Sequence, residues 1–388
     1  MDKKVSRGSE ADENNILSEV SFDEVNSGEV KKKHSVGYMI GRIGIVILCN
    51  ILLLAVLLYG MMLIITRGPS NTLKELFVMT VKETSAGGFL ANMCLPKDEI
   101  EAILAKKQSA ADGESSRGQT NTSLININNG RNNNNNSQDG SQGNTPDTTP
   151  DNNDENDTGI EVVEVRGSTY RGTMMIVSDP SRVTLGIPDA YGDNCVGLKL
   201  RAMMEKYDAV AGINAGGFVD IGGTGKGGQP TGIIIKDGKV LWGGMTGKVS
   251  VIGFDANHIL HVGTMSAGEA LEAGVTEACS FGPALIINGI PCNSTGNLSG
   301  GYNPRTAIGQ RADGAVLLLV VEGRQLGSLG ATFDDLVEIM QSFDAVNASN
   351  LDGGGSSLMI YDGGSLNTSA YIYGERVLAS SFLVLKKK

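Results

Sequence analysis

In the stretch Asn350-Leu-Asp-Gly-Gly-Gly-Ser-Ser357, one carboxylate directly precedes three glycines and two hydroxyls. Glycine adopts positive φ and lets a ligand come close to the backbone, so three glycines in a row predict exposed N–H groups that bind an anion. A tight glycine-rich turn capped by Asp352 accounts for the same residues. The neighbouring segments of the chain decide between these two interpretations.

Three other segments place polar side chains at the ends of short β-type runs. They are Asn214-Ala-Gly-Gly-Phe218, Asn303-Pro-Arg-Thr-Ala-Ile-Gly-Gln310 and Glu322-Gly-Arg324. The guanidinium of Arg305 is suited to planar, bidentate capture of a phosphate or a carboxylate. Each segment alone is typical of local hydrogen bonding or of a solvated charge at a strand end. Together they supply carboxylates, guanidinium groups and two glycine-rich loops, which favours an anion-binding site.

The composition changes at residue 159, where a β-rich region begins. Asp237-Gly238 lies between two β-type runs and is a strong hairpin signal. Helices are expected only at 198–206, 267–273 and 332–343. Further β-type runs are expected at 161–165, 170–177, 183–187, 249–254, 258–262, 284–287 and 315–322. We therefore predict that residues 159–388 form a single β-rich domain with a few helices, of the α+β class.

An uncharged apolar run, Gly44 to Ile65, precedes this domain. Roughly 20 such residues span a bilayer core, so a transmembrane helix is predicted at 39–66. A cleaved signal peptide is disfavoured, because the run is too long and no small-residue cleavage site follows soon after it. Lys31 to Lys33 and Arg42 precede the run, so the N-terminus is expected in the cytoplasm and the domain outside the cell.

The segments on both sides of the apolar run have little capacity to form a core. Residues 1–38 are polar and acidic, which predicts a disordered cytoplasmic tail. Residues 67–107 have apolar side chains at helical spacing and are expected to form a helical stalk. Residues 108–158 are rich in Asn and are predicted to be a disordered linker with a reach of roughly 40 Å. The net charge of −11 argues against a nucleic-acid-binding surface.

The spacing of the metal-ligating residue types matches no metal or cofactor motif. Cys279 and Cys292 are compatible with a disulfide bridge and equally with unpaired buried thiols. His258 and His261 are expected on opposite faces of a strand, which excludes a zinc pair or a Ser-His triad. The glycines of 223–228 precede no helix and so form no dinucleotide loop. We expect no cofactor; a divalent cation such as calcium is compatible with Asp352, but no EF-hand-like spacing supports it.

The order of the four motifs, NAGGF, NPRTAIG, EGR and LDGGGSS, resembles the phosphodiester glycosidase family, the family of the uncovering enzyme. The resemblance covers most of residues 160–386. A membrane anchor that precedes the domain is similar to the bacterial, membrane-anchored members. Membership implies an enzyme, a glycosidase that hydrolyses a sugar-1-phosphodiester.

The resemblance implies catalytic roles for Asp352, Glu322 and Arg305. Arg305 and the amides of Gly353 to Gly355 would stabilise charge on the leaving phosphate. One carboxylate would stabilise the oxocarbenium-like centre or activate water, and the assignment between Asp352 and Glu322 stays open. The residues expected to bind substrate are Asn214, Gly216, Gly217, Asn303, Thr306, Arg324, Gly353, Gly354, Gly355 and Ser356.

The predicted function is that of a single-pass membrane protein whose extracellular hydrolase domain acts on a sugar-phosphate-containing polymer or glycolipid. The substrate class includes cell-wall polymer and exopolysaccharide. The alternative is a non-catalytic module that binds cell-wall polymer in the same pocket. The carboxylates favour the enzyme, because recognition of an anion gains nothing from Asp352 or Glu322 beside it.

Overall fold

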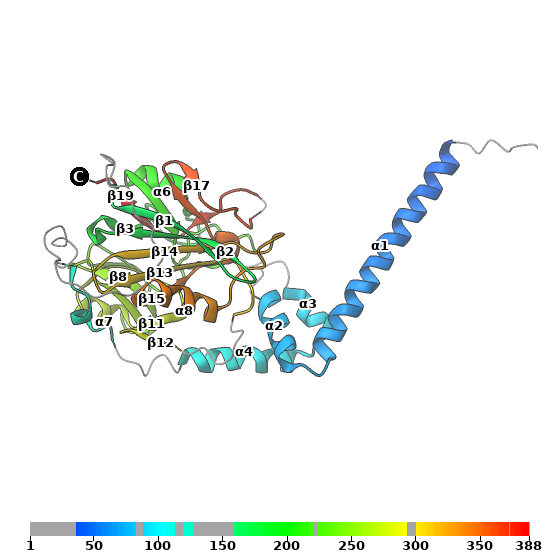
Figure 1. The fold of residues 1–388 in the computed structure, drawn as a ribbon, viewed down its shortest axis with the longest axis horizontal. Helices are drawn as coiled ribbons and strands as arrows, with labels where there is room; N and C mark the ends of the chain where they lie inside the picture. The colour runs from blue at the N-terminus through cyan, green and yellow to red at the C-terminus, as the bar shows by residue number, and fades with distance from the viewer. Residues whose placement is uncertain are drawn as a thin grey trace, which may run out of the picture. The chain divides into compact units, whose positions relative to one another are not determined.

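The computed structural model describes residues 36–82, 88–112, 119–127, 158–220, 223–292, 300–371 and 373–387 (Figure 1). The chain divides into two compact units, residues 1–59 and residues 60–388. Most of the predicted tail, 1–38, and most of the predicted linker, 108–158, lie outside the described residues.

Helix α1 (Val36–Arg67) contains the apolar run. Its segment Arg42–Arg67 is long and apolar enough to cross a membrane, and it is the one such helix among the described residues. The predicted transmembrane segment, 39–66, therefore lies entirely within a helix, as its length and composition require.

Three short helices follow α1, in the region where the sequence predicts a helical stalk. They are α2 (Asn71–Lys82), α3 (Gly88–Cys94) and α4 (Lys97–Asp112). Apolar side chains from all three are buried against one another, and an ion pair of 2.7 Å joins Lys74 of α2 to Glu99 of α4. The buried residues of this small core are Val78, Ala91, Leu95, Ile100 and Ile103.

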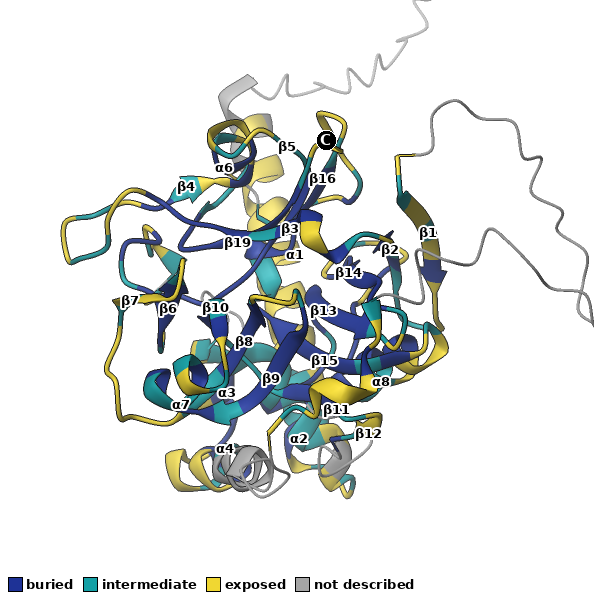
Figure 2. Cartoon of the chain, turned by 90° about the vertical axis from the view of Figure 1, so that its left-hand side faces the viewer, coloured by how far each residue is buried: buried dark blue, intermediate teal, exposed yellow. Residues whose placement is uncertain are grey.

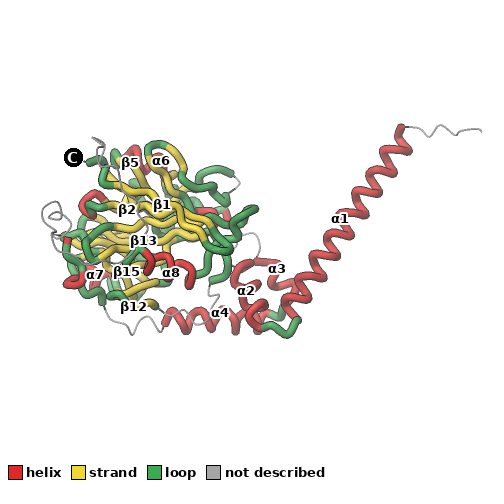
Figure 3. Tube along the Cα trace, viewed as in Figure 1, coloured by secondary structure: helices red, strands yellow, loops and turns green. Residues whose placement is uncertain are grey.

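Three antiparallel sheets make up most of the domain that follows (Figures 1 and 3). The first has the order β1 (Ile160–Arg166), β2 (Arg171–Val177), β14 (Val316–Val321), β13 (Arg305–Arg311), β15 (Ala345–Leu351), β11 (Ala284–Ile287), β12 (Ile290–Pro291). The second has the order β17 (Gly364–Ser365), β16 (Met359–Tyr361), β5 (Ala209–Asn214), β19 (Ser381–Leu385), β3 (Val183–Gly186). The third has the order β7 (Lys239–Trp242), β6 (Ile234–Lys236), β10 (Val275–Ser280), β8 (Val249–Asp255), β9 (Leu260–Met265).

The remaining elements are short. A two-stranded sheet pairs β4 (Leu198–Lys199) with β18 (Val377–Leu378). The helices are α6 (Leu200–Lys206), α7 (Ala267–Glu272), α8 (Phe333–Ser342) and the 3₁₀ turns η2 (Thr122–Leu124), η3 (Pro180–Arg182) and η5 (Gly354–Ser356). The domain is thus β-rich with few helices, and the predicted α+β class is confirmed.

Local sequence signals explain several of these elements. Asp237 and Gly238 both adopt positive φ between β6 and β7, as a tight hairpin turn requires. Helix α8 begins with a capping box in which Thr332 and Asp335 each bond the other's backbone. The six residues of β14 are all buried, which explains why this strand is apolar at every position.

Two apolar clusters form the main core, one on each face of the seven-stranded sheet. Helix α8 covers one face with Leu336, Ile339 and Met340. The other face packs against the second and third sheets, where the rings of Phe254 and Phe382 meet edge to face at 5.9 Å. Figure 2 shows the central strands of all three sheets as buried. Cys279 and Cys292 both lie in this core as free thiols, so the bridge left open by the sequence does not form.

Residues 119–127, named here the docked segment, lie against the domain although they fall within the predicted linker. The Oγ1 of Thr120 accepts from the amide of Val262 at 3.1 Å, and the amide of Asn121 donates to Asn288 Oδ1 at 2.7 Å. The amide of Asn126 donates to the carbonyl of Ala312 at 2.7 Å, and the side chain of Ile125 is 5% exposed. This segment therefore packs as part of the globular unit.

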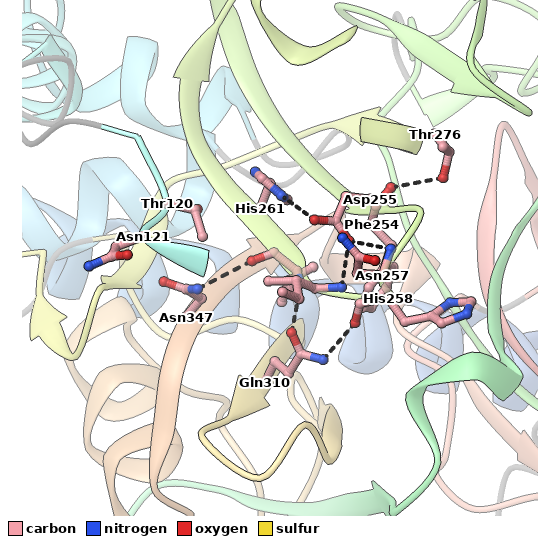
Figure 4. Close-up of polar contacts among 12 residues, drawn as sticks. Thr120, Asn121, Phe254, Asp255, Asn257, His258, His261, Thr276, Gln310 and Asn347 are labelled. Atoms are coloured by element: carbon pink, nitrogen blue, oxygen red, sulfur yellow. Dashed lines mark hydrogen bonds and ion pairs between the residues drawn. The ribbon is translucent and has the colours of Figure 1, made fainter. Parts of the chain in front are cut away.

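Buried polar groups surround the strand that receives the docked segment (Figure 4). His261 on β9 lies 3.2 Å from the Asp255 carboxylate, and Gln310 accepts from the amide of Leu260 at 2.6 Å. The prediction that His258 lies on this strand is wrong. His258 has a φ of 60° in the turn before β9, and its carbonyl accepts from Gln310 at 2.8 Å.

Candidate active site

A cavity of about 300 Å³ opens at one end of the seven-stranded sheet. The register pairs Arg305 with Val321 and Thr306 with Leu351, so the start of β13 meets the ends of β14 and β15 there. Three of the predicted motifs are brought together by this antiparallel arrangement. The cavity is lined by Asp220, Phe281, Gly282, Asn303, Arg305, Arg324, Phe333, Asn350, Asp352, Gly353, Gly354, Gly355 and Arg376.

Asp352 lines this cavity from the loop after β15. Its amide donates to the carbonyl of Ala215 at 2.9 Å, which holds the loop against the end of β5. Burial raises the pKa of the Asp352 carboxyl to about 6, although hydrogen bonds from Ser356 and Gly353 and the charge of Arg376 oppose the rise. The carboxyl therefore changes its charge near pH 6, which makes it a candidate for acid–base chemistry.

A second carboxylate in the cavity belongs to Asp220, which the sequence does not single out. It forms an ion pair of 2.6 Å with Arg376, and its Oδ1 accepts from the amide of Gly225 at 2.7 Å. Its charge also contributes to the raised pKa of Asp352. The only sequence signal for Asp220 is its position two residues after the NAGGF motif.

Arg376 is likewise absent from the predicted site. Its guanidinium packs 4.8 Å from the ring centroid of Phe218 and 5.6 Å from that of Tyr371. Its Nη1 lies 3.4 Å from the hydroxyl of Ser356. The residue sits in a loop before β18 without any periodic pattern, so nothing in the sequence relates it to the glycine loop.

Two predicted arginines reach the cavity in different ways. Arg305 is 4% exposed, donates to the carbonyls of Ala331 and Gly301 at 3.1 and 3.0 Å and also bonds Gly300. Arg324 is exposed and donates to Asn303 Oδ1 at 2.8 Å. Because the donors of Arg305 are largely occupied by backbone, Arg324 offers the more accessible guanidinium.

The glycine loop differs from the predicted open row of amides. The amide of Gly354 donates to the carbonyl of Pro304 at 2.8 Å, and the amide of Gly353 bonds the Asp352 carboxylate. A Cβ at Gly353 would lie 2.8 Å from the Pro304 carbonyl, and Gly354 has a φ of 61°. Close packing and positive φ thus explain these glycines. Ser356 is buried beneath the loop and bonds Asp352 instead of lining the cavity.

Glu322 does not line the cavity, in contrast to the role implied by its motif. One carboxylate oxygen pairs with Arg171 of β2, and the other accepts from the amide of Thr368 at 2.6 Å. Its side chain is one-tenth exposed. Both oxygens are therefore engaged, and Glu322 holds β2, β14 and the 368 loop together.

The NAGGF motif contacts the Asp352 loop without lining the cavity. Asn214 donates to the carbonyl of Asp352 at 2.5 Å and accepts from the hydroxyl of Thr306 at 2.8 Å. Gly216 and Gly217 bond Ser380 and Ser280, and neither lines the cavity. Asn214, with Thr306 bonded to it, positions the Asp352 loop, and none of these four predicted substrate-binding residues lines the cavity.

No metal centre accompanies the cavity within the ranges that the structure covers. In those ranges, no group of three or more His, Cys, Asp or Glu side chains is placed to hold a metal ion. The charged groups of the cavity are two carboxylates and three guanidiniums, a set suited to an anionic ligand.

Part of the chain is similar to a known protein family. The phosphodiester glycosidase family model matches residues 207–385. The SPbeta prophage-derived uncharacterized protein YomE of Bacillus subtilis (strain 168) is 32% identical over 176 residues, covering 43% of this chain and 26% of that protein. The N-acetylglucosamine-1-phosphodiester alpha-N-acetylglucosaminidase of Mus musculus is 27% identical over 222 residues, covering 52% of this chain and 42% of that enzyme. This chain therefore spans less than half the length of both curated relatives.

Solved structures also resemble the chain. The catalytic domain of the zebrafish N-acetylglucosamine-1-phosphodiester alpha-N-acetylglucosaminidase, auto-inhibited by its pro-peptide, matches with a TM-score of 0.49 and 18% identity. The match covers 60% of this chain and 86% of that one.

The cavity holds a charged set suited to an anionic ligand, and residues 207–385 around it match the phosphodiester glycosidase family model. This match agrees with the resemblance that the order of the motifs predicts.

Proposed function

We propose that the domain hydrolyses the glycosidic bond of a sugar-1-phosphodiester. The observation that carries the proposal is the pairing of one reactive carboxyl, Asp352, with three guanidiniums in a single cavity. The match to the phosphodiester glycosidase family supports the same reaction class.

Different residues of the cavity are suited to the sugar carbon and to the phosphate oxygen of the bond that breaks. The C1–O bond breaks, water supplies a hydroxyl to C1, and the electron pair leaves with a phosphomonoester. Phosphate is a weakly basic leaving group, so electrostatic stabilisation by Arg324 and Arg376 matters more than its protonation. The ionised Asp352 then acts on the sugar side, where it stabilises the oxocarbenium-like centre or activates water.

Asp220 and Arg305 have supporting roles in this scheme. Asp220 is held by Arg376 and Gly225, so its oxygens are engaged, and its charge acts on Asp352. Arg305 anchors the 300–301 loop to the start of β13, with its guanidinium 4.3 Å from the ring centroid of Phe333.

We further propose that helix α1 anchors the protein in a membrane with the N-terminus in the cytoplasm. The support is the apolar segment Arg42–Arg67 and the lysines that precede it. The substrate would then be a polymer or glycolipid at the cell surface that carries sugar-1-phosphodiester units.

The test is hydrolysis of a panel of sugar-1-phosphodiesters and UDP-sugars in ¹⁸O-labelled water. We expect release of free sugar and phosphomonoester, with the label on the sugar. The Asp352→Asn variant should lose at least 10³-fold in turnover, a loss on the scale of general base or nucleophilic catalysis. Asp237→Asn, in the exposed hairpin turn, is the matched control.

Two outcomes would contradict the proposal. Label on the phosphate would indicate P–O cleavage and therefore a phosphodiesterase. Tight binding of the same compounds without turnover, unchanged in Asp352→Asn, would indicate the non-catalytic binding module.

A further inference from the structure

Asn350 lies at the end of β15 and lines the cavity, although it is 1% exposed. Its Nδ2 donates to the carbonyl of Gly282 at 2.8 Å, and its main-chain amide donates to the carbonyl of Pro283 at 3.0 Å. Because a carbonyl only accepts, the amide nitrogen must face Gly282. The orientation of the side-chain amide is thereby fixed.

The other end of this amide is unsatisfied. Among the described residues, Oδ1 of Asn350 has no hydrogen-bond partner. Buried polar atoms in folded proteins are nearly always bonded, and an acceptor left without a donor is unfavourable. An unpaired acceptor at the wall of a binding cavity is therefore explained most directly by a donor that arrives with the ligand.

The chemistry of that donor follows from the surroundings. The guanidiniums of Arg305, Arg324 and Arg376 suit a phosphate, whose oxygens accept hydrogen bonds. An ionised phosphodiester has no hydrogen to give to Asn350. The partner must therefore be another part of the ligand, and a sugar carries donors as hydroxyl or acetamido N–H groups.

We propose that Asn350 Oδ1 accepts a hydrogen bond from the sugar and makes the cavity selective for a sugar phosphate over phosphate alone. The proposal rests on the proposed function for the substrate class, because it assigns the sugar end of that substrate. It is independent of the rate of hydrolysis, so binding alone tests it.

A matched control lies three residues away on the same strand. Asn347 is also fully buried, but both ends of its amide are bonded, to the carbonyl of Leu260 at 3.2 Å and from the amide of Asn288 at 2.9 Å. It does not line the cavity. Loss of Asn347 therefore reports the effect of removing a buried asparagine from β15 without removing the unpaired acceptor.

The experiment measures dissociation constants of the full-length protein in detergent for inorganic phosphate, glucose-1-phosphate and N-acetylglucosamine-1-phosphate. We expect the wild type to bind one of the sugar phosphates at least tenfold more tightly than phosphate. Asn350→Ala should lose about tenfold in affinity for that sugar phosphate and change less than twofold for phosphate. Asn347→Ala should leave the ratio of the two affinities unchanged.

A second variant and a ligand series guard against misfolding. Asn350→Gln retains both the donor and the acceptor of the side-chain amide and should keep most of the preference. Monodeoxyfluoro sugar phosphates cannot donate at the substituted position, and one of them should bind the wild type about tenfold less tightly. Equal affinity of the wild type for phosphate and both sugar phosphates would overturn the inference, as would an unchanged ratio in Asn350→Ala. Absence of turnover with the preference intact would overturn only the proposed function.

Discussion

Asp352 is a buried, titratable carboxyl that lies in one of the predicted motifs. Its pKa of about 6 lies above that of an exposed aspartate because the loop removes the carboxylate from water and places Asp220 nearby. Ser356, Gly353 and Arg376 partly compensate the loss of solvent. A carboxyl in such surroundings is costly for stability and useful for chemistry, and the two effects lead to separate predictions.

The first prediction concerns activity against pH. Because the ionised form of Asp352 is required, kcat/KM should rise about tenfold per pH unit below pH 6 and level off above it. The measurement is hydrolysis of a sugar-1-phosphodiester between pH 4.5 and 8. A decline above pH 6 would instead assign Asp352 the role of a proton donor.

The second prediction concerns stability against pH. The folded pKa of Asp352 is raised, so its contribution favours folding at low pH and is lost as pH rises from about 4 to 6. Asp352→Asn should therefore melt at a higher temperature than the wild type at pH 7.5, and the difference should shrink toward pH 4.5. Calorimetry checks this, and a variant less stable than the wild type at pH 7.5 would disagree with the raised pKa.

The third prediction separates Glu322 from the chemistry. Glu322→Gln leaves Arg171 without its charge partner and should destabilise the fold by about 2 kcal/mol, toward the low end for a partly buried pair. At a temperature where the variant is folded, kcat/KM should stay within about threefold of the wild type. A loss comparable to that of Asp352→Asn would return Glu322 to the catalytic residues.

At the scale of elements, the docked segment contributes to the fold of the domain. Ile125 is 5% exposed, whereas the neighbouring Leu124 is 41% exposed. The docked segment lies against β9 and the 312–314 turn. This location could not be predicted, because the flanking Asn-rich sequence predicts disorder and gives no signal for a short buried stretch.

Substitution of these two residues provides the fourth prediction. Ile125→Ser removes roughly 2 kcal/mol of apolar burial, which should lower the melting temperature of the full chain by about 4–8 °C. Leu124→Ser should change it by less than about 2 °C, which corresponds to about 0.5 kcal/mol at most. Equal effects of the two substitutions would show that the segment does not pack in solution.

The sequence predicts the elements better than it predicts the site. Three elements are predicted from neighbouring residues alone, because short-range geometry determines them. They are the turn at Asp237-Gly238, the buried strand at 316–321 and the cap of α8. The cavity is assembled from loops far apart in the chain, so motif order identifies Asp352, Arg305 and Arg324 as its residues but misses Asp220 and Arg376. Motif order also predicts Asn214 and Glu322 in the site, although their hydrogen bonds show that they hold neighbouring loops in place.

At the scale of the whole molecule, topology decides which substrates are accessible. Lys31 to Lys33 and Arg42 precede the uncharged apolar run Gly44 to Ile65 and favour an N-terminus inside the cell. In that arrangement the cavity faces cell-surface polymers or glycolipids and not cytoplasmic nucleotide sugars.

Protease accessibility supplies the fifth prediction. Trypsin added to intact protoplasts should cut at Arg117, within the predicted linker, and release a soluble domain. A tag on the N-terminus should remain protected until lysis. Cleavage of the tag and protection of the linker in intact protoplasts would show the opposite topology and contradict the proposed substrate class.

The docked segment also limits the distance between helix α4 and the domain. Because 119–127 is fixed to the domain, the chain between the end of α4 and the domain is residues 113–118 alone, which span at most about 25 Å from anchor to anchor. The Asn-rich residues 128–157 return to the same domain at both ends, so their number can vary without changing how far the cavity lies from α4. Lengthening 113–118 would therefore be the change that raises the upper limit on the distance between α4 and the docked segment.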